Sequence, residues 1–235
     1  MIFEGRPPFQ DRVDAGKQLA EKLKIYQSAE TIVLAIPRGG VPVAIEVARS
    51  FNAPLDVVVT RKIAIPDNPE AGYGAVAEDG TVFLNEPLLS QLGLSQRQIE
   101  YQANQVLAEI ERRSALYRGK LPRTSLTDKT AIIIDDGLAS GFTMVAAVKS
   151  IQLQKAARIV AASPVASGKA YELIQPSCDA LVCIVVSHFY PFAVASFYHH
   201  WHDLTDEEVT GYLKAWQTRR VREKGKDFQD GSLPE

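Results

Sequence analysis

Two spacings of hydrophobic residues alternate along the chain. Consecutive aliphatic residues are typical of strands that are covered on both faces in a parallel sheet, whereas intervals of three and four residues indicate helices that pack by one side. The aliphatic runs lie at 31–36, 55–60, 131–134, 158–162 and 180–186. Helix-spaced segments lie between most of them. The pattern predicts an α/β fold with an open, mostly parallel sheet and helices on both faces.

Three helices have recognisable first residues. Asp11 is the predicted N-cap of the first helix. A long helix starting at Ser95 and a last helix starting at Thr205 each begin with a capping box, in which a Gln or Glu three residues later completes the cap. The last helix is expected to fray beyond Arg219 into a polar tail at 221–235.

Residues 65–86 are rich in Pro and Gly and indicate a loop-like excursion from the core. Within them, apolar residues alternate on both sides of Asp79 and Gly80, which fit a two-residue type I′ turn between two strands. We therefore expect a hairpin. The residues alone leave open whether this hairpin is a mobile lid or an ordinary surface excursion.

Two adjacent carboxylates, Asp135 and Asp136, end the aliphatic run at 131–134. The hydrophobic spacing becomes helical from Met144, so the loop at 137–143 leads into a helix N-terminus. Such an N-terminus binds anions, because its first N–H groups lack internal partners and the helix dipole is positive there. The sequence therefore predicts an anion-binding loop.

The side chains around this loop indicate the kind of ligand that it binds. Gly141 lets the backbone approach the ligand, and Ser140 and Thr143 add hydroxyl donors for phosphate oxygens. Two carboxylates beside a phosphate suit vicinal sugar hydroxyls or a divalent cation. Phosphate, ribose and Mg²⁺ are therefore indicated together. An acid-rich turn before a capped helix, in an unrelated α/β protein, is the alternative.

A second anion-binding turn follows the first predicted strand. The Arg-Gly-Gly sequence at 38–40 leads to Pro42 at the first helical position. Its arginine supplies positive charge, although ordinary turns use the same residues. Arg61 and Lys62 follow the second predicted strand, at the sheet edge where open α/β folds bind ligands. Lone basic residues at strand ends are, however, usually solvated.

The string from Asp135 to Thr143 resembles the signature of type I phosphoribosyltransferases: two acids, two variable residues, a small residue, Thr or Ser, Gly, one residue and Thr. In that family the paired acids hold the ribose 2′- and 3′-hydroxyls of phosphoribosyl pyrophosphate (PRPP), and the loop holds its 5′-phosphate. Ser140 stands where Thr is commoner, and Phe142 where a small residue is usual. Neither departure removes a required donor.

The resemblance implies roles for specific residues. Asp135 and Asp136 would be catalytic residues and ligands of the Mg²⁺ cofactor. Arg38 and Lys62 would be catalytic residues that contact the pyrophosphate, and Lys62 is preferred over Arg61 for this role. In this family the loop that contacts the pyrophosphate often contains a cis peptide. The lid would close over PRPP and exclude water, which can otherwise capture the developing ribosyl cation. The residues implied in PRPP binding are Gly39, Gly40, Gly137, Ala139, Ser140, Gly141, Phe142 and Thr143.

The implied activity is transfer of the 5-phosphoribosyl group of PRPP to an unidentified nucleophile, a nucleobase or related ring, with release of pyrophosphate in nucleotide metabolism. A PRPP-sensing regulator without transfer chemistry is the alternative. A sugar-phosphate hydrolase is a weaker interpretation, since the chain shows no clear nucleophile–base pair.

The segment FQDRVDAG and the PRGG turn resemble a little-characterised branch of the family whose acceptor is uncertain. Ala139 stands where purine-salvage members carry an Asp that exchanges a proton with the base.

Residues 187–220 hold all four histidines and a dense set of aromatic residues. His199, His200 and His202 lack the spacing of a helical zinc site and have no Cys or Glu at ligand spacing, so a metal site is disfavoured there. Since the family builds its acceptor-binding hood from variable segments, we expect the aromatic residues to cover the acceptor; core or a homodimer contact is the alternative. The expected hood residues are Phe189, Tyr190, Phe197, Tyr198 and Trp201.

Composition narrows these expectations. A chain of 235 residues with 46% hydrophobic content can bury one complete core, so we expect a single domain with its core at about 31–186. The net charge of −2 and the pI near 6.1 disfavour nucleic acid as the main ligand.

Cys178 and Cys183 lack metal or disulfide spacing and are expected to be reduced. The N-terminus has no apolar signal core, and 180–186 is too short to span a bilayer; a cytoplasmic protein without a membrane partner is expected.

Overall fold

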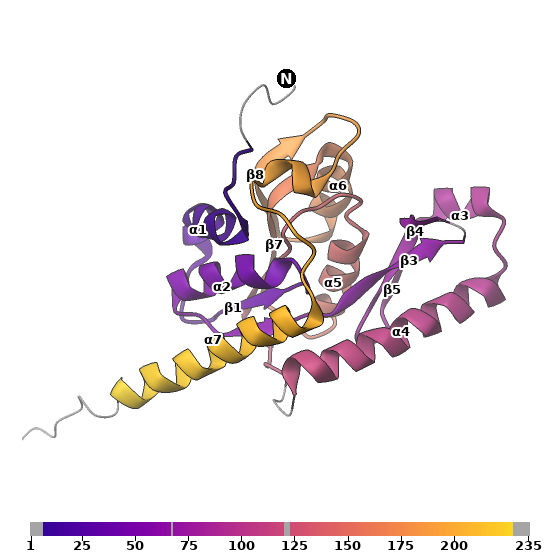
Figure 1. Cartoon of the computed structure of the whole chain (residues 1–235). Helices are drawn as coiled ribbons and strands as arrows, with labels where there is room; N and C mark the ends of the chain where they lie inside the picture. The colour runs from indigo at the N-terminus through magenta and orange to yellow at the C-terminus, as the bar shows by residue number, and fades with distance from the viewer. Residues whose placement is uncertain (1–6, 67, 120–122, 228–235) are drawn as a thin grey trace, which may run out of the picture.

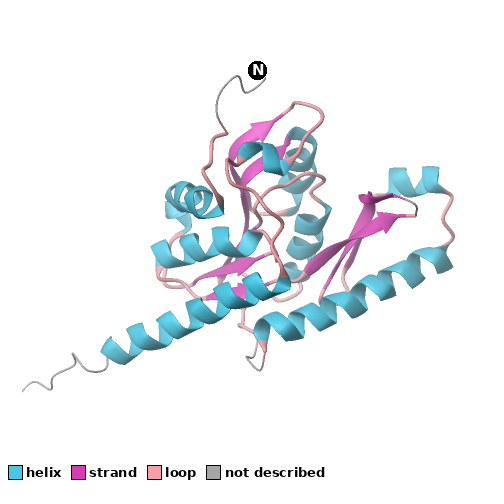
Figure 2. Ribbon diagram, in the orientation of Figure 1, coloured by secondary structure: helices cyan, strands magenta, loops and turns pink. Residues whose placement is uncertain are grey.

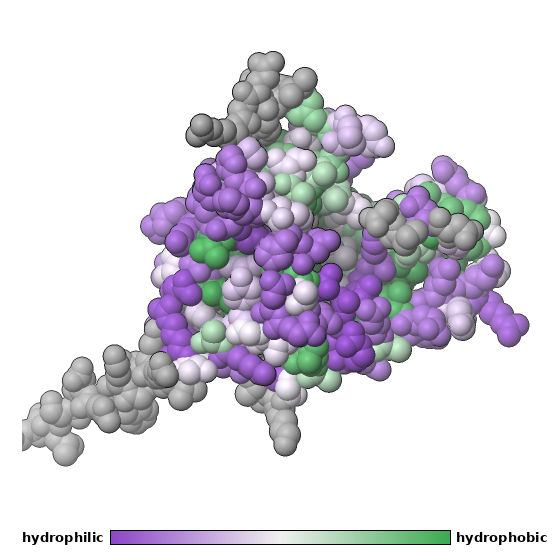
Figure 3. All heavy atoms as spheres, in the orientation of Figure 1, coloured by the Kyte–Doolittle hydropathy of each residue, from purple (hydrophilic) through white to green (hydrophobic). Residues whose placement is uncertain are grey.

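The computed structural model describes residues 7–66, 68–119 and 123–227 (Figure 1). Figure 2 shows a body in which helices flank a sheet and an arm, residues 60–118, that extends away from it. Figure 3 shows that the visible face is mostly hydrophilic, with scattered hydrophobic patches. No helix within the described ranges has the length and hydrophobicity needed to cross a bilayer.

Five parallel strands form the main sheet, in the order β2-β1-β6-β7-β8. β6 is the run that ends at the acid pair, and it is the middle strand. Ala35 of β1, Ile134 of β6 and Ala162 of β7 lie side by side. β1 and β6 end close to this level, whereas β7 continues to Ser167. The strands are β1 (Thr31–Ala35), β2 (Leu55–Val57), β6 (Thr130–Ile134), β7 (Arg158–Ser167) and β8 (Ala180–Ser187).

Helices cover both faces of this sheet, as the unbroken aliphatic runs require. Ile132 and Ile134 of β6 pack in one hydrophobic cluster with α1 and α2, whereas Ile133 packs in another with α5 and α6. Successive strand residues point to opposite faces, so three consecutive isoleucines need both layers. The predicted α/β fold is confirmed. The helices are α1 (Arg12–Leu23), η1 (Lys24–Tyr26), α2 (Gly40–Phe51), α5 (Phe142–Gln152), α6 (Gly168–Ile174) and η2 (Gln175–Ser177).

The arm is a three-stranded antiparallel sheet backed by a long helix (Figure 1). Tyr73, Ile99 and Ile110 are buried where the helix meets the strands. The stretch expected to form the lid contributes β4 and β5. The arm elements are β3 (Thr60–Ile65), β4 (Asn68–Ala77), β5 (Val82–Leu84), α3 (Glu86–Leu92) and α4 (Gln96–Arg118), which starts with the predicted capping box.

The second predicted strand is divided in the structure. The sequence predicts one strand at 55–60, but pairing with β1 ends at Val57, and the arm strand β3 starts at Thr60. The aliphatic run therefore serves two sheets in succession. As a result, Arg61 and Lys62 lie within an arm strand rather than beyond the end of a main-sheet strand.

The predicted hairpin is present, but its turn differs from the predicted type I′ turn. Gly80 has a φ of 83°, whereas Asp79 is not among the residues with positive φ, and the Gly80 N–H donates to the Ala77 carbonyl at 2.9 Å. A type I′ turn needs positive φ at both central residues. The geometry is that of a type I turn followed by a left-handed glycine.

A buried ion-pair group joins the arm to the body at the end of α4. Arg118 donates to the carboxylates of Glu78 in the hairpin turn, at 2.7 Å, and of Asp56 in β2, at 3.0 Å. All three side chains are mostly buried, which is tolerated because each charge has a partner. The hairpin turn is thereby tied to the body, and Glu78 has a structural role.

The N-terminal segment pairs with the segment that follows β8. Phe9 forms a parallel bridge with Tyr198, and their ring centroids are 5.4 Å apart. After η3 (Val194–Phe197), the last helix α7 spans Asp206–Asp227. It continues past Arg219, where the sequence predicts fraying, because the Arg, Glu and Lys residues that follow favour helix. Residues 228–235 of the predicted tail are outside the described residues.

Candidate active site

The two predicted anion-binding loops lie next to each other at the carboxyl edge of the main sheet. The Ile36 N–H donates to the Ile134 carbonyl at 2.8 Å, and the Asp135 N–H donates to the Ala162 carbonyl at 3.2 Å. Backbone pairing therefore continues from β1, β6 and β7 into the loops. Because parallel strands carry their ends to one edge, segments about 100 residues apart in sequence meet there.

Glycine is required where the two loops touch. A methyl group on Gly39 would overlap the Asp136 carboxylate, and one on Gly40 would collide with the Ile134 carbonyl. The peptide bond between Pro37 and Arg38 is cis, as the resemblance implies. The sequence predicts these glycines from anion binding. The structure adds a packing reason, since they let the loop that carries the acids approach the turn.

Asp135 and Asp136 present two adjacent carboxylates at this edge. The Asp136 N–H donates to Oδ1 of Asp135 at 2.8 Å. Burial raises the pKa of the Asp135 carboxyl well above its ordinary value, and the neighbouring charge of Asp136 raises it further, although that N–H and the charge of Arg12 oppose the shift. The pair therefore gains from a bound cation or from hydroxyl donors.

Asp136 has two partners that the sequence analysis does not identify. Arg12 donates from Nε to its Oδ2 at 2.8 Å, and the Tyr198 hydroxyl donates to its backbone carbonyl at 2.6 Å. Burial raises the pKa of the Tyr198 hydroxyl, and the charge of Asp136 raises it further, so the hydroxyl stays a donor. Arg12 and Asp136 are 124 residues apart, and no local pattern links them.

The loop after the acid pair exposes Ala139 and Ser140 before α5 begins. Gly141 has a φ of 80°, a left-handed conformation that glycine adopts at low cost, and it directs the chain into the helix. Ser140 Oγ accepts from the Phe142 N–H at 3.4 Å, and Thr143 lies in the first helical turn. The predicted donors thus gather at a helix N-terminus, which suits a phosphate.

Ser167 supports this loop and is absent from the sequence prediction of the site. Its Oγ donates to the Ala139 carbonyl at 2.7 Å and accepts from the Ala170 N–H at 3.0 Å, which caps α6. A Ser before a helix-spaced segment is a recognisable N-cap signal. Its contact with the loop, in contrast, follows from the tertiary arrangement alone.

Phe142 packs between the loop and the arm. Its ring lies 5.6 Å, centroid to centroid, from Phe83 of β5, in a cluster with Ala75 and Ala77 of β4 and Ala146 of α5. Small residues on β4 and α5 leave room for the two rings. The bulky residue that departs from the family signature therefore links the candidate phosphate loop to the arm.

Phe142→Leu is expected to destabilise the protein by about 1 kcal/mol, the energy of one aromatic contact beyond its burial. This corresponds to a fall in melting temperature of about 2–4 °C for a chain of this size. Urea unfolding would measure it. Because the effect is assigned to one ring pair, Phe83→Leu should add little in the Phe142→Leu background; additive losses would contradict the assignment.

Arg61 lies among charged side chains of both signs. Burial lowers the pKa of the Arg61 guanidinium, and the charges of Arg113 and Arg38 lower it further, whereas Glu109 opposes them. Arg61 and Arg113 both form ion pairs with Glu109. Arg61 thus lies within electrostatic reach of Arg38, while Lys62, the next residue along β3, is on the opposite face of the strand.

The five expected hood residues differ in exposure. Phe197 and Tyr198 are buried, and the half-buried Trp201 packs on Tyr198 with ring centroids 5.1 Å apart. Phe189 and Tyr190 are exposed, Tyr190 to 94%. Phe197, Tyr198 and Trp201 therefore form the packed interior of the segment. Phe189 and Tyr190 are the two hood residues whose rings face solvent.

The predicted hood segment covers the beginning of the candidate phosphate loop. Val194 packs directly on Gly137, where any larger residue would overlap its side chain. The Tyr198 hydroxyl bonds the carbonyl of the preceding residue, Asp136. The predicted hood segment and the predicted acid pair are therefore neighbours, although the sequence separates Tyr198 from Asp136 by 62 residues.

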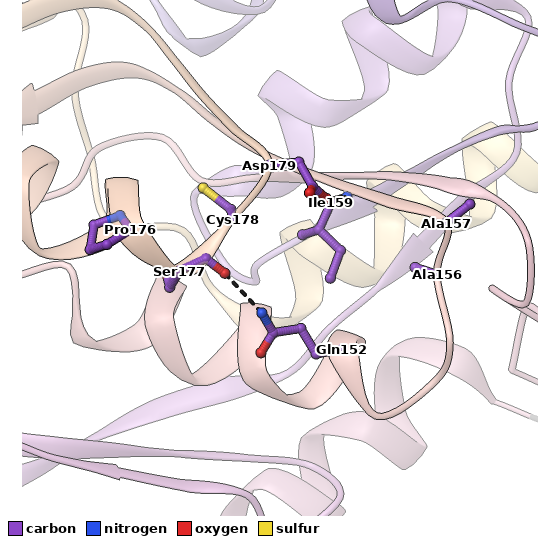
Figure 4. Close-up of a pocket in the computed structure, with 8 residues that line it drawn as sticks. All are labelled: Gln152, Ala156, Ala157, Ile159, Pro176, Ser177, Cys178 and Asp179. Carbon is purple, nitrogen blue, oxygen red and sulfur yellow. Dashed lines mark hydrogen bonds between the residues drawn. The ribbon is translucent and has the colours of Figure 1, made fainter.

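A separate cavity of about 380 Å³ opens at the opposite, amino edge of the main sheet (Figure 4). Gln152 Nε2 donates to the Ser177 carbonyl at 2.9 Å, and Asp179 Oδ2 accepts from the Ile159 N–H at 2.7 Å. These groups stabilise the start of β7 and the end of α5. The cavity is remote from both predicted anion-binding loops.

Comparison with known proteins identifies one family. A family model described as "Phosphoribosyl transferase domain" matches residues 10–197. "Putative phosphoribosyl transferase Rv0571c" from Mycobacterium tuberculosis (strain ATCC 25618 / H37Rv) is 37% identical over 205 residues, which are 87% of this chain and 46% of that protein. This chain thus spans about half the length of that relative. The crystal structure of TT1426 from Thermus thermophilus is 35% identical, with a TM-score of 0.75, and the match covers 90% of this chain and 99% of that chain.

Proposed function

The chain belongs to the phosphoribosyl transferase domain family, and from this premise we propose that it moves the 5-phosphoribosyl group of PRPP to a nucleobase or related ring, with release of pyrophosphate. The predicted membership of the phosphoribosyltransferase family is confirmed by the family model and the relatives. The observation that carries the proposal is the close approach of the Asp136 carboxylate to Gly39. It joins a candidate ribose-binding acid to the candidate pyrophosphate turn.

Each part of PRPP has a proposed partner at this edge. Ala139 to Thr143 and the N-terminus of α5 bind the 5′-phosphate, and Asp135 and Asp136 accept from the ribose hydroxyls. The Arg38 to Gly40 turn binds the pyrophosphate, and of the two basic residues on opposite faces of β3 the sequence prediction assigns Lys62 to it. Because Arg61 is influenced by the charge of Arg38, it is a further candidate for that group. An anion there would relieve the repulsion between the arginines.

The chemistry asked of these residues is positioning and electrostatic stabilisation. Holding the 5′-phosphate and the pyrophosphate at opposite ends fixes the bond that breaks between them. Positive groups on the pyrophosphate stabilise the charge that develops on the leaving group. The acid pair lies on the ribose side, where positive charge develops on the sugar. Closure of the predicted lid, residues 65–86, would exclude water from that sugar.

The donor set fits Mg²⁺ as the proposed cofactor. No group of three or more His, Cys, Asp or Glu residues within the described ranges is arranged to hold a metal by itself. Mg²⁺ is commonly bound through one or two carboxylates together with substrate phosphates and water. Asp135 and Asp136 would be its protein ligands. When bound, the ion would neutralise charge on the PRPP oxygens.

The hood is proposed to receive the acceptor. Phe189 and Tyr190 have exposed rings, and a flat heterocycle could stack on such faces. Phe197, Tyr198 and Trp201 would then support the segment beneath them. Val194 on Gly137 brings this segment close to the acid pair, where the acceptor has to meet the ribose. We propose the cytoplasm and nucleotide metabolism as the setting.

Incubation with PRPP, Mg²⁺ and a panel of nucleobases and related rings tests the proposal. Release of pyrophosphate that depends on one acceptor, with formation of its ribosyl phosphate, is the expected result. A rise in melting temperature with PRPP and Mg²⁺, without release for any acceptor, would favour the PRPP-sensing regulator. Absence of both responses would contradict both functions.

Arg38→Ala is expected to weaken PRPP binding by roughly 10–100-fold, the effect of losing hydrogen bonding from a charged donor. Ribose 5-phosphate should bind almost unchanged, because it carries no pyrophosphate. Isothermal titration calorimetry with Mg²⁺ would measure both affinities. Arg49→Ala is a matched control, since Arg49 pairs with Glu46 at the far end of α2. Equal losses for the two ligands would remove Arg38 from this role.

A further inference from the structure

The guanidinium of Arg12 is held by three groups beside the acid pair. Its Nε donates to Asp136 Oδ2 at 2.8 Å, its Nη1 donates to the His202 carbonyl at 3.0 Å, and its central carbon lies 3.8 Å from the centroid of the Trp201 ring. The side chains of Arg12 and Asp136 are only 8% and 13% exposed. An ion pair, a hydrogen bond and a ring face therefore fix its position.

The backbone around Arg12 is fixed as well. Asp11 caps α1 by accepting from the Asp14 N–H at 2.8 Å, which sets where the helix starts. On the other side, the His199 N–H donates to the Phe9 carbonyl at 2.9 Å and the His200 N–H donates to the Gln10 carbonyl at 2.8 Å. These bonds hold the N-terminal segment in register with the hood segment, so Arg12 meets Trp201.

The contacts of Asp136 leave its carboxylate little freedom. It lies against Gly39 of the turn, its Oδ2 is bound by Arg12, and its backbone carbonyl is bound by the Tyr198 hydroxyl. Without Arg12, a mostly buried carboxylate would remain beside a second carboxylate and would lose the ion pair that offsets its burial, which is strongly unfavourable. Rotation away from Asp135 would relieve the repulsion and would move the acid from the ribose.

We propose that Arg12 is a positioning residue, which holds Asp136 in the orientation that binds the ribose of PRPP, and that Trp201 holds Arg12 by its ring face. The inference rests on the proposed function, since it assigns a role toward PRPP. It also gives the N-terminal helix and the hood segment a shared task at the acid pair. Arginine suits this task, because its planar fork can bond two partners while it stacks on a ring.

Binding of three ligands to the full chain separates positioning of the ribose acid from a general effect on folding. The probes are PRPP with Mg²⁺, ribose 5-phosphate, and pyrophosphate with Mg²⁺, each measured by calorimetry. Arg12→Gln is expected to weaken PRPP and ribose 5-phosphate by roughly 10–100-fold. Pyrophosphate, which has no ribose, should keep its affinity within about twofold. A merely structural role would lower the melting temperature without this selectivity.

A double-mutant cycle tests whether Arg12 acts through Asp136. In the Asp136→Asn background, Arg12→Gln should add no further loss of PRPP affinity, because the group that it positions is already changed. Arg12→Lys should recover part of the loss, since it restores the charge but not the fork. Trp201→Phe should bind PRPP nearly like the parent, and Trp201→Leu should resemble a weakened Arg12 variant.

Arg49→Gln is the matched control, because it also removes an arginine from a mostly buried carboxylate, Glu46, at 2.6 Å. It should lower the melting temperature and leave all three affinities unchanged. Parent-like binding of both ribose ligands to Arg12→Gln would overturn the inference, as would equal loss for pyrophosphate or additive losses in the cycle. If Arg12→Gln does not fold, Arg12→Lys and Trp201→Leu decide the same question. A parent chain that binds none of the three ligands would remove the proposed function, and the inference with it.

Discussion

Replacing Asp135 and Asp136 together by asparagine is expected to abolish most of the rise in melting temperature that PRPP with Mg²⁺ gives the parent chain. A ligand that binds the native state at about 100 times its Kd stabilises it by about 2.7 kcal/mol. For a chain of this size that is a rise of roughly 5–10 °C. The asparagines keep the shape of the side chains but remove the charges that accept from the ribose and hold Mg²⁺. Thermal unfolding with and without ligand measures the rise.

The parent and the double variant have to be compared by the rise in melting temperature that the ligand causes, and not by the melting temperature itself. Asp136→Asn leaves Arg12 without its anionic partner, which by itself lowers the stability of the ligand-free protein. Asp179→Asn is a suitable control, since Asp179 lies at the amino edge of the sheet and bonds the Ile159 N–H there. A double variant that gains as much from PRPP as the parent would show that the ribose assignment is wrong.

Hypoxanthine and guanine are expected to be poor acceptors, with turnover roughly 10²–10⁴-fold below an ordinary enzyme rate of ~10 s⁻¹. The resemblance implies an Asp at the position of Ala139 in purine-salvage members, where it exchanges a proton with the base. In this chain Ala139 is exposed, and its carbonyl accepts from Ser167, so the position offers no titratable group. Steady-state kinetics with each base and saturating PRPP would measure the rates.

Ala139→Asp provides the matched comparison for this prediction. If the missing acid limits the 6-oxopurines, restoring it should raise their turnover and leave PRPP affinity unchanged. Turnover of hypoxanthine or guanine by the parent chain at an ordinary rate would contradict the exclusion. It would also show that another group has taken over the proton transfer.

The candidate site divides into parts that are local in sequence and parts that are not. The acid pair, Gly141 and the helix start at Phe142 follow one another within a single segment, so spacing alone predicts a strand, a loop and a helix N-terminus. The structure has each of them in that order. The support of this loop is not local. Arg12 and Tyr198 reach Asp136 from opposite ends of the chain, and their local patterns indicate only a helix and an aromatic segment.

The arm shows the same division. The hairpin at 75–84 is predictable, because alternation and the Asp-Gly pair lie within a few residues. Its turn type depends on how the strands twist against each other, and the structure has a left-handed Gly80 without the predicted type I′ geometry. The run at 55–60 is uniformly aliphatic, so nothing in it marks the point where the chain leaves the main sheet for the arm. Because the chain leaves the main sheet after Val57, Arg61 and Lys62 lie in β3.

The sequence by itself determined the α/β class, the order of most elements and the positions of the two predicted anion-binding loops. These depend on hydrophobic period, caps and turn residues, which act over one or two turns of chain. Tertiary structure alone decided that Gly39 meets Asp136 and that Arg12 is held between Asp136 and Trp201. Such contacts depend on which strand ends and segments share an edge. That follows from strand order and segment pairing across the whole chain, which no local spacing records.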